Sequence, residues 1–202
     1  MQDVANTVRL VSLDGDPRGE IPLPGLGSVS GFTGRADDTE TWYSFDSYLS
    51  PGVIYHHNLV SGSSRVFRQP TIDFPFEHYV SERVFYTSAD GTRVPLWLVR
   101  RADVRPDGRR PVILYGYGGF NVSLTPSYST ARLPWLEQGG VWAVANLRGG
   151  AEYGEQWHEA GTREHKQNVF DDFIAAAEYL IEEGWTTADR LAVMGGSNGG
   201  LL

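Results

Sequence analysis

The sequence predicts an α/β protein in which antiparallel β-strands precede a region of alternating strands and helices. Upstream of about residue 70, short runs of β-branched and aromatic residues are interrupted every several residues by turn-forming residues, which is typical of antiparallel strands. Downstream, wholly apolar runs end in glycines and alternate with an amphipathic segment. This second pattern is typical of a parallel sheet covered by helices.

Composition and charge exclude several classes of protein. The chain has 202 residues, of which 41% are hydrophobic and 21% charged, as in ordinary globular domains. Its formal net charge of −8 argues against a nucleic-acid partner, because phosphate binding requires clustered Lys and Arg. No apolar run approaches the roughly 18 residues of a membrane span. The absence of Cys excludes disulfides and Cys-ligated zinc sites.

The upstream region contains several candidate strands separated by turns. Residues 8–13 lead into a turn at 14–17, and residues 41–45 run toward a predicted turn at 50–52, followed by residues 53–55. Such strands fit a small barrel, a fragment of a sandwich, or one to two blades of a propeller. No repeat of fixed period in the sequence selects one of the three.

Pro70 and Pro75 mark an expected domain boundary, with one domain at residues 1–70 and the other at 71–202. Just beyond it, two apolar stretches flank Asp90-Gly91, which predicts a β-hairpin.

Three apolar runs, residues 111–115, 141–145 and 191–194, are expected to be strands buried on both faces. Each ends in a glycine-rich segment, so these segments should meet at the carboxyl edge of the sheet, where chemistry is carried in such folds. Before the third run, helical spacing predicts an amphipathic helix with Asn168 as its N-cap and Gly184 at its end. Its predicted apolar face comprises Phe170, Phe173, Ile174, Ala177, Leu180 and Ile181.

The third apolar run leads directly into a G-x-S-x-G motif, residues 195–199. In a nucleophile elbow the serine lies on a sharp strand-to-helix turn, so Gly195, Gly196 and Gly199 are expected to allow the turn to close. Ser197 would then be the nucleophile, and the backbone N–H of Asn198 would donate to the oxyanion. A glycine- and serine-rich loop without catalytic role is the alternative, and the preceding buried strand favours the elbow.

Three segments closely resemble the prolyl oligopeptidase family, serine peptidases that cleave after proline. They are residues 115–121 (YGYGGFN), 145–154 (ANLRGGAEYG) and 195–200 (GGSNGG). Asn198 and the first segment favour this family over the related oligopeptidase B and acylaminoacyl peptidases. Because residues 39–52 resemble the closing blades of the family's β-propeller, the resemblance covers the whole chain. It implies an incomplete α/β-hydrolase domain preceded by the last blades of a propeller.

The resemblance also implies roles for individual residues. Ser197 matches the nucleophile, the Asn198 N–H and the Tyr117 hydroxyl match the two oxyanion donors, and Phe120 matches a wall of the pocket for the proline ring. Packing roles are the alternatives for Tyr117 and Phe120. No metal or organic cofactor is implied.

Other polar residues near these segments are expected to be structural. Arg148 and Glu152 should form a buried ion pair that fixes a loop. The five histidines should be surface or packing residues, because their spacing fits no metal site; they are His56, His57, His78, His158 and His165.

The implied function is a serine endopeptidase that hydrolyses short peptides on the carboxyl side of proline through an acyl-enzyme. Its expected partners are short proline-containing peptides, with no nucleic acid and no membrane. The parent enzyme is expected to be monomeric and cytoplasmic, with the periplasm as the alternative location. Two other functions stay open: an esterase or related oligopeptidase of different specificity, and a non-catalytic hydrolase-like binding protein.

We expect the chain to be an internal fragment of a longer enzyme, because the triad acid and histidine of α/β-hydrolases follow the serine and only five residues follow Ser197. We therefore predict that the 202-residue chain lacks appreciable peptidase activity, since Ser197 has no base to take its proton. It should also dissolve poorly, because its last strand exposes an apolar edge. Burst release from a post-proline chromogenic substrate by the purified chain would contradict the first prediction.

Overall fold

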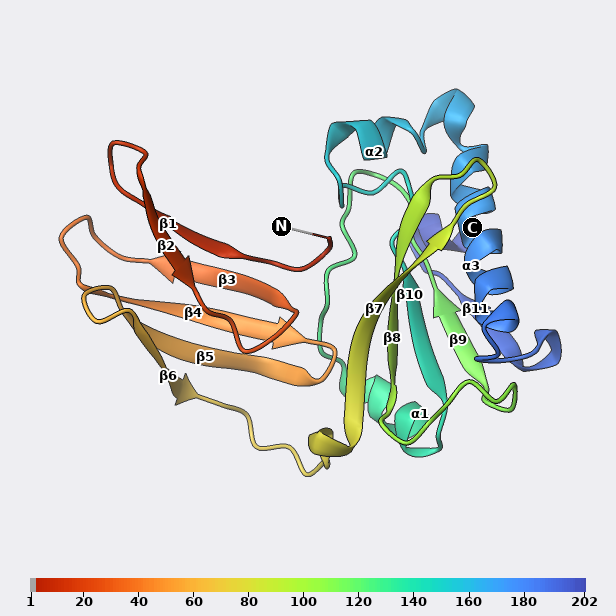
Figure 1. Ribbon diagram of the computed structural model, residues 1–202, viewed down its shortest axis with the longest axis horizontal. Helices are drawn as coiled ribbons and strands as arrows, with labels where there is room; N and C mark the ends of the chain where they lie inside the picture. Colours follow the sequence, from red (N-terminus) through yellow and green to blue (C-terminus); the bar gives the residue numbers. More distant parts are fainter. Residues whose placement is uncertain (1–2) are drawn as a thin grey trace. The chain divides into compact units, whose positions relative to one another are not determined.

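The computed structural model of the protein describes residues 3–202, which form two compact units (Figure 1). The first unit comprises the residues up to Phe74 together with Thr125–Ser129. The second comprises Pro75–Leu124 and Thr130–Leu202. Strands β1–β6 build the first unit, and strands β7–β11 with helices α1–α3 build the second.

The first unit contains a two-stranded ribbon and a four-stranded sheet, both antiparallel. The ribbon pairs β1 with β2, and the sheet is a meander in which β3, β4, β5 and β6 follow one another in chain order. A meander of four antiparallel strands is the arrangement of a propeller blade. The strands are β1 (Val8–Val11), β2 (Pro17–Ile21), β3 (Ser28–Thr33), β4 (Glu40–Ser47), β5 (Ser50–Asn58) and β6 (Ser63–Arg68).

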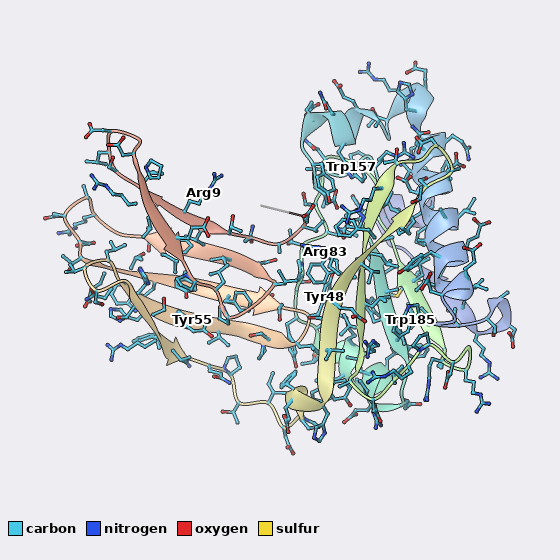
Figure 2. All side chains as sticks on the ribbon, viewed as in Figure 1. Arg9, Tyr48, Tyr55, Arg83, Trp157 and Trp185 are labelled. Atoms are coloured by element: carbon cyan, nitrogen blue, oxygen red, sulfur yellow. The ribbon has the colours of Figure 1, made fainter. Side chains whose placement is uncertain are left out.

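A small apolar cluster joins the ribbon to the meander. Ile21 of β2 is buried with Tyr43 and Phe45 of β4. Tyr43 in turn stacks on Tyr55 of β5, with ring centroids 5.2 Å apart. Figure 2 labels Tyr55 on this sheet. Because side chains alternate along a strand, every second residue of β4 from Thr41 onward is buried on the face that carries this cluster.

The turn predicted at residues 50–52 is wrong by two positions. β4 ends at Ser47 and β5 begins at Ser50, so the turn consists of the two residues between them. Pro51 and Gly52 lie inside β5 as a bulge, where two residues stand opposite one on β4 and Gly52 adopts a φ of 58°. The sequence pattern misled because Pro and Gly mark bulges as well as turns.

Thr125–Ser129 packs with the first unit, although both of its flanking segments belong to the second. The Ser28 hydroxyl donates to the Pro126 carbonyl at 2.7 Å, and the Tyr128 N–H donates to Asp46 Oδ1 at 3.1 Å. These bonds attach the segment to β3 and β4.

The second unit is built on a five-stranded mixed sheet of order β11-β9-β10-β8-β7. Strand β9 pairs in parallel with both β10 and β11, whereas β8 is antiparallel to β10 and to β7. The predicted hairpin around Asp90-Gly91 and the three predicted parallel strands are confirmed. The elements are β7 (Tyr79–Thr87), β8 (Arg93–Arg101), β9 (Val112–Tyr115), α1 (Leu133–Glu137), β10 (Val141–Ala145), α2 (Glu155–Glu159), α3 (Gln167–Glu182) and β11 (Leu191–Met194).

Helix α3 runs along one face of this sheet and supplies most of the helical part of its core (Figure 1). It buries Val169, Phe173, Ala176 and Leu180 against alternate residues of β8, β9 and β10. Gly184 follows the helix with a φ of 73°, as predicted for its end.

Two details of the predicted helix are wrong. Ile174 and Ile181 are exposed, because a fully buried carboxylate, Asp172, occupies the inner face and rotates the apolar stripe away from the predicted one. The N-cap is Lys166, and Asn168 lies within the first turn, where its amide donates to the Ala160 carbonyl at 2.8 Å.

Strand β11 departs from the expected burial on both faces. It is an edge strand of the sheet, and Val193 is 65% exposed because no segment within residues 3–202 covers it. The apolar edge expected at the last strand is therefore present.

Candidate active site

Three glycine-rich loops meet at the carboxyl edge of β9, β10 and β11, as the sequence predicted. The Asn121 N–H, in the loop after β9, donates to the Gly149 carbonyl after β10 at 3.1 Å. The Gly116 N–H donates to the Met194 carbonyl at the end of β11 at 3.3 Å. Backbone hydrogen bonds therefore connect all three strand ends.

Ser197 lies on a strained turn between β11 and a short 3-10 helix at Ser197–Gly200. Its φ of 54° falls in the left-handed region, which a non-glycine residue adopts only at an energetic cost. The residue is exposed, and its hydroxyl has no hydrogen-bond partner among residues 3–202. A serine held in this way at the end of a parallel strand has the geometry of a nucleophile elbow.

Two of the three predicted elbow glycines are required by close packing. A Cβ at Gly195 would overlap the Gly199 carbonyl, and a Cβ at Gly199 would overlap the Gly116 carbonyl. At Gly196 the expected steric requirement is wrong, because a Cβ there would meet nothing within 4 Å among the described residues. Its φ of −122° is also open to any residue.

Asn198 connects the elbow to the loop after β9. Its side-chain amide donates to the Tyr117 carbonyl, and a Cβ at Gly119 would lie only 2.5 Å from the same amide nitrogen. The Asn198 backbone N–H donates no hydrogen bond within residues 3–202. The structure therefore brings Ser197, Asn198 and the loop carrying Tyr117 together, and leaves one backbone donor unused beside the serine.

A cavity of about 500 Å³ adjoins the elbow. Phe120, at a φ of 53° and 75% exposed, lines this cavity together with Asn198. The other residues that matter to its chemistry are Asn121, His158, Arg163 and Lys166. An exposed aromatic residue and the residue after the elbow serine thus share one cavity.

Arg148 anchors the loop after β10 through a buried ion-pair network. Its guanidinium donates to Asp172 Oδ1 on α3 at 2.6 Å and to Asp90 Oδ2 in the β7–β8 turn at 2.5 Å. A further bond reaches the Ser88 hydroxyl at 3.3 Å. Arg148 is 4% exposed and Asp172 is 0% exposed. One side chain therefore connects the loop to a helix and to a hairpin.

The predicted pair between Arg148 and Glu152 is wrong. Glu152 Oε1 instead accepts from the Leu124 N–H at 3.0 Å and from the Asn146 amide at 3.2 Å. Burial raises the pKa of Glu152, and these hydrogen bonds only partly oppose that rise. A separation of four residues places two side chains together on a helix, but this segment is a loop, so Asp172 reaches the guanidinium instead.

The network changes the protonation of its members. Hydrogen bonding from Arg148 lowers the pKa of Asp90 to about 2, and the Thr92 N–H adds to this. A carboxyl whose pKa falls on folding stabilises the fold above its unfolded value of 3.8, and this contribution is lost as the pH falls toward 2. Burial alone would lower the pKa of Arg148, but bonds to Asp172 and Asp90 raise it overall.

His158 and Lys166 are two positioning residues that the sequence did not reveal. His158 Nδ1 donates to the Gly149 carbonyl and Lys166 Nζ donates to the Gly118 carbonyl, each at 2.8 Å. Their only signal in the sequence is a position after a glycine-rich segment. Within residues 3–202, no group of three or more His, Asp or Glu side chains is placed to hold a metal ion.

Comparison with known proteins agrees with this geometry. A family model described as the prolyl oligopeptidase family matches residues 126–202. A second model, described as the N-terminal β-propeller domain of prolyl oligopeptidase, matches residues 1–70. The chain belongs to the prolyl oligopeptidase family. The expected fold class, antiparallel propeller strands followed by part of an α/β-hydrolase domain, is thereby confirmed.

Individual relatives of this family match all or nearly all of the chain. A prolyl endopeptidase of Elizabethkingia miricola is 48% identical over all 202 residues, which cover 29% of that protein. A solved structure from an analysis of two prolyl endopeptidases matches with a TM-score of 0.94 and 47% identity, over 100% of this chain and 30% of the other. Prolyl oligopeptidase B of Galerina marginata, bound to a 35-residue hydrolysis and macrocyclization substrate, matches with a TM-score of 0.92 and 33% identity, over 98% of this chain and 29% of the other.

The chain therefore spans about 29% of the length of the curated relatives that it matches. None of the helices described within residues 3–202 combines the length and the apolar character needed to cross a bilayer.

We predict that the two carboxylates bound by Arg148 differ sharply in their effect on stability. Asp172→Asn should lower the free energy of unfolding by about 3–5 kcal/mol, because it leaves a buried guanidinium without its enclosed partner. Asp90→Asn should cost less than about 1 kcal/mol, because Asp90 is half-exposed. Urea unfolding of the domain that contains the five-stranded sheet measures the loss of stability in each variant. Equal losses for the two variants would contradict the buried pairing.

Proposed function

We propose that these residues belong to a serine endopeptidase that hydrolyses short peptides on the carboxyl side of proline through an acyl-enzyme. The observation that carries the proposal is the left-handed Ser197 on a turn closed by Gly195 and Gly199 at the end of a parallel strand. Similar proteins named prolyl endopeptidases support the choice of substrate. The activity is proposed for a protein of the relatives' length that contains these residues.

In the proposed mechanism, Ser197 attacks the carbonyl carbon that follows the proline ring. The Asn198 N–H and the Tyr117 hydroxyl stabilise the oxyanion, and Phe120 forms a wall of the proline pocket. A histidine oriented by a carboxylate, supplied by the length that these residues do not span, takes the serine proton and returns it to the leaving amine. The same histidine then takes a proton from water, which attacks the acyl-enzyme carbonyl, and Ser197 leaves with its proton restored.

The proposal assigns residues 1–70 to the C-terminal part of a β-propeller and residues 71–202 to the N-terminal part of the catalytic domain. The range matched by the propeller model supports the first assignment. We further propose that the protein acts as a monomer on peptides, in the cytoplasm or the periplasm.

A substrate panel tests the proposed specificity against an esterase or a related peptidase. The protein should release product from post-proline amides and much less from post-arginine amides or simple esters. A higher kcat/KM for either of the other two classes would overturn the post-proline assignment while keeping the nucleophile. A protein that cleaves none of the three classes would favour a binding function.

The nucleophile can be tested by covalent labelling. Ser197→Ala should abolish labelling by an organophosphonate, because the reagent forms its bond with the activated hydroxyl. Ser61→Ala, which changes an exposed serine in a turn of the first unit, should leave labelling intact and serves as the control. Stoichiometric labelling of Ser197→Ala, located by mass spectrometry on another serine, would contradict the assignment.

The second oxyanion donor can be tested by removing one hydroxyl. Tyr117→Phe should lower kcat by about 10²–10³, the usual loss for one oxyanion donor, with a smaller effect on KM. Tyr115→Phe is the matched control, because Tyr115 lies two residues earlier on β9, where its ring stacks on Trp142. A Tyr117→Phe enzyme as fast as the wild type would remove Tyr117 from this role.

A further inference from the structure

The cavity beside the elbow carries positive charge that the proposed reaction does not use. Lys166 and Arg163 line it together with His158. None of its lining residues, all of which fall within the described range, is Asp or Glu. This local excess of cations occurs in a chain whose formal net charge is −8.

Lys166 is partly buried without a counter-ion. Its ammonium donates to the Gly118 carbonyl at 2.8 Å and forms no ion pair with any residue in the range 3–202. Burial lowers the pKa of Lys166, which is the shift expected for a cation with no anionic neighbour. An ammonium has three donors, so two remain for a ligand in the cavity.

Arg163 adds a second cation without an ion-pair partner among the described residues. Arg163 and His158 also line an adjoining hollow together with Glu155, Glu159 and Glu164, so acidic side chains lie near Arg163. None of these carboxylates lines the cavity at the elbow, and Lys166 does not line the adjoining hollow. Among the described residues, the ionised side chains that line the cavity itself are therefore cations.

We propose that the cavity at the elbow binds a carboxylate of the peptide substrate, through Lys166 and Arg163. The inference rests on the proposed function, because Phe120 and Asn198 line the same cavity and place the carboxylate close to the bond that is cleaved. Both a terminal carboxylate and an acidic side chain have the required chemistry. Hydrogen bonds between two charged groups are about twice as strong as neutral ones, so the effect is large enough to measure.

Matched peptides test the inference in a protein of the relatives' length that contains these residues. One series exchanges Glu for Gln at each position flanking the cleaved proline bond. The other series compares a free C-terminal carboxylate with its amide. At low salt, the carboxylate member of at least one pair should be cleaved with a kcat/KM about tenfold higher. The position in which this occurs distinguishes a side chain from the chain terminus.

Variants of the two cations that line the cavity test whether the preference for a carboxylate arises there. Lys166→Met and Arg163→Gln should each reduce the ratio of the two kcat/KM values toward 1, whereas Lys166→Arg should keep most of it. The ratio is formed within each variant, so general changes in activity cancel. Arg105→Gln is the control, because Arg105 is an exposed cation of the same unit that lies outside the cavity. Arg163→Gln removes no hydrogen bond to the loop after β9, so it stays informative if Lys166→Met fails to fold.

The outcomes separate this inference from the proposed function. If every peptide is cleaved after proline but all ratios are near 1, the carboxylate site is overturned and the peptidase assignment stands. A clear preference that persists in both Lys166→Met and Arg163→Gln also overturns the site. If no peptide of either series is cleaved, the proposed function fails and this inference fails with it.

Discussion

The buried pairing of Arg148 with Asp172 determines where the loop after β10 lies, and the rest of the candidate site depends on that loop. The residue after Arg148, Gly149, accepts hydrogen bonds from the Asn121 N–H and from His158. A displaced Arg148 would therefore release both the loop after β9 and the segment around α2. Enclosing two charges is costly unless their hydrogen bonds are satisfied. Here the guanidinium binds two carboxylates and a hydroxyl, so the enclosed charge is well satisfied.

With that loop held, the elbow can retain its strained serine. A non-glycine residue in the left-handed region costs of order 1–3 kcal/mol and persists only where its surroundings fix it. The surroundings of Ser197 are backbone atoms rather than side chains: Gly195 packs on the Gly199 carbonyl, and Gly199 packs on the Gly116 carbonyl. Rigid backbone contacts leave the serine no room to relax, while the open space beside Gly196 keeps its other side accessible.

The sequence was sufficient to predict the structure wherever the local pattern and the tertiary structure agree. The hairpin at Asp90-Gly91, the three parallel strands and the elbow all follow from short runs whose neighbours along the chain decide their conformation. Prediction from the sequence failed where a residue distant in the chain decides the position of a side chain. Nothing near Asp172 in the sequence shows that Arg148, 24 positions earlier, pairs with its carboxylate. The turn predicted at residues 50–52 was wrong for a different reason. Pro51 and Gly52 can form either a turn or a bulge, and the pairing with the opposite strand decides which.

Whether the cations beside the elbow attract an anionic peptide depends on how far the negative charge of the chain acts. The net charge of −8 repels anionic peptides, but screening limits that repulsion to about 8 Å at physiological ionic strength. Inside the cavity the nearest charges dominate, and no described residue that lines it together with Lys166 and Arg163 is Asp or Glu. Lys166 also donates to the carbonyl of Gly118, the residue directly after the proposed oxyanion donor Tyr117. A substrate carboxylate bound to Lys166 keeps its charge throughout acyl transfer, so this contact is made equally in the ground state and in the transition state. Uniform binding of this kind lowers KM without raising kcat, so the advantage of acidic peptides should appear more in KM than in kcat.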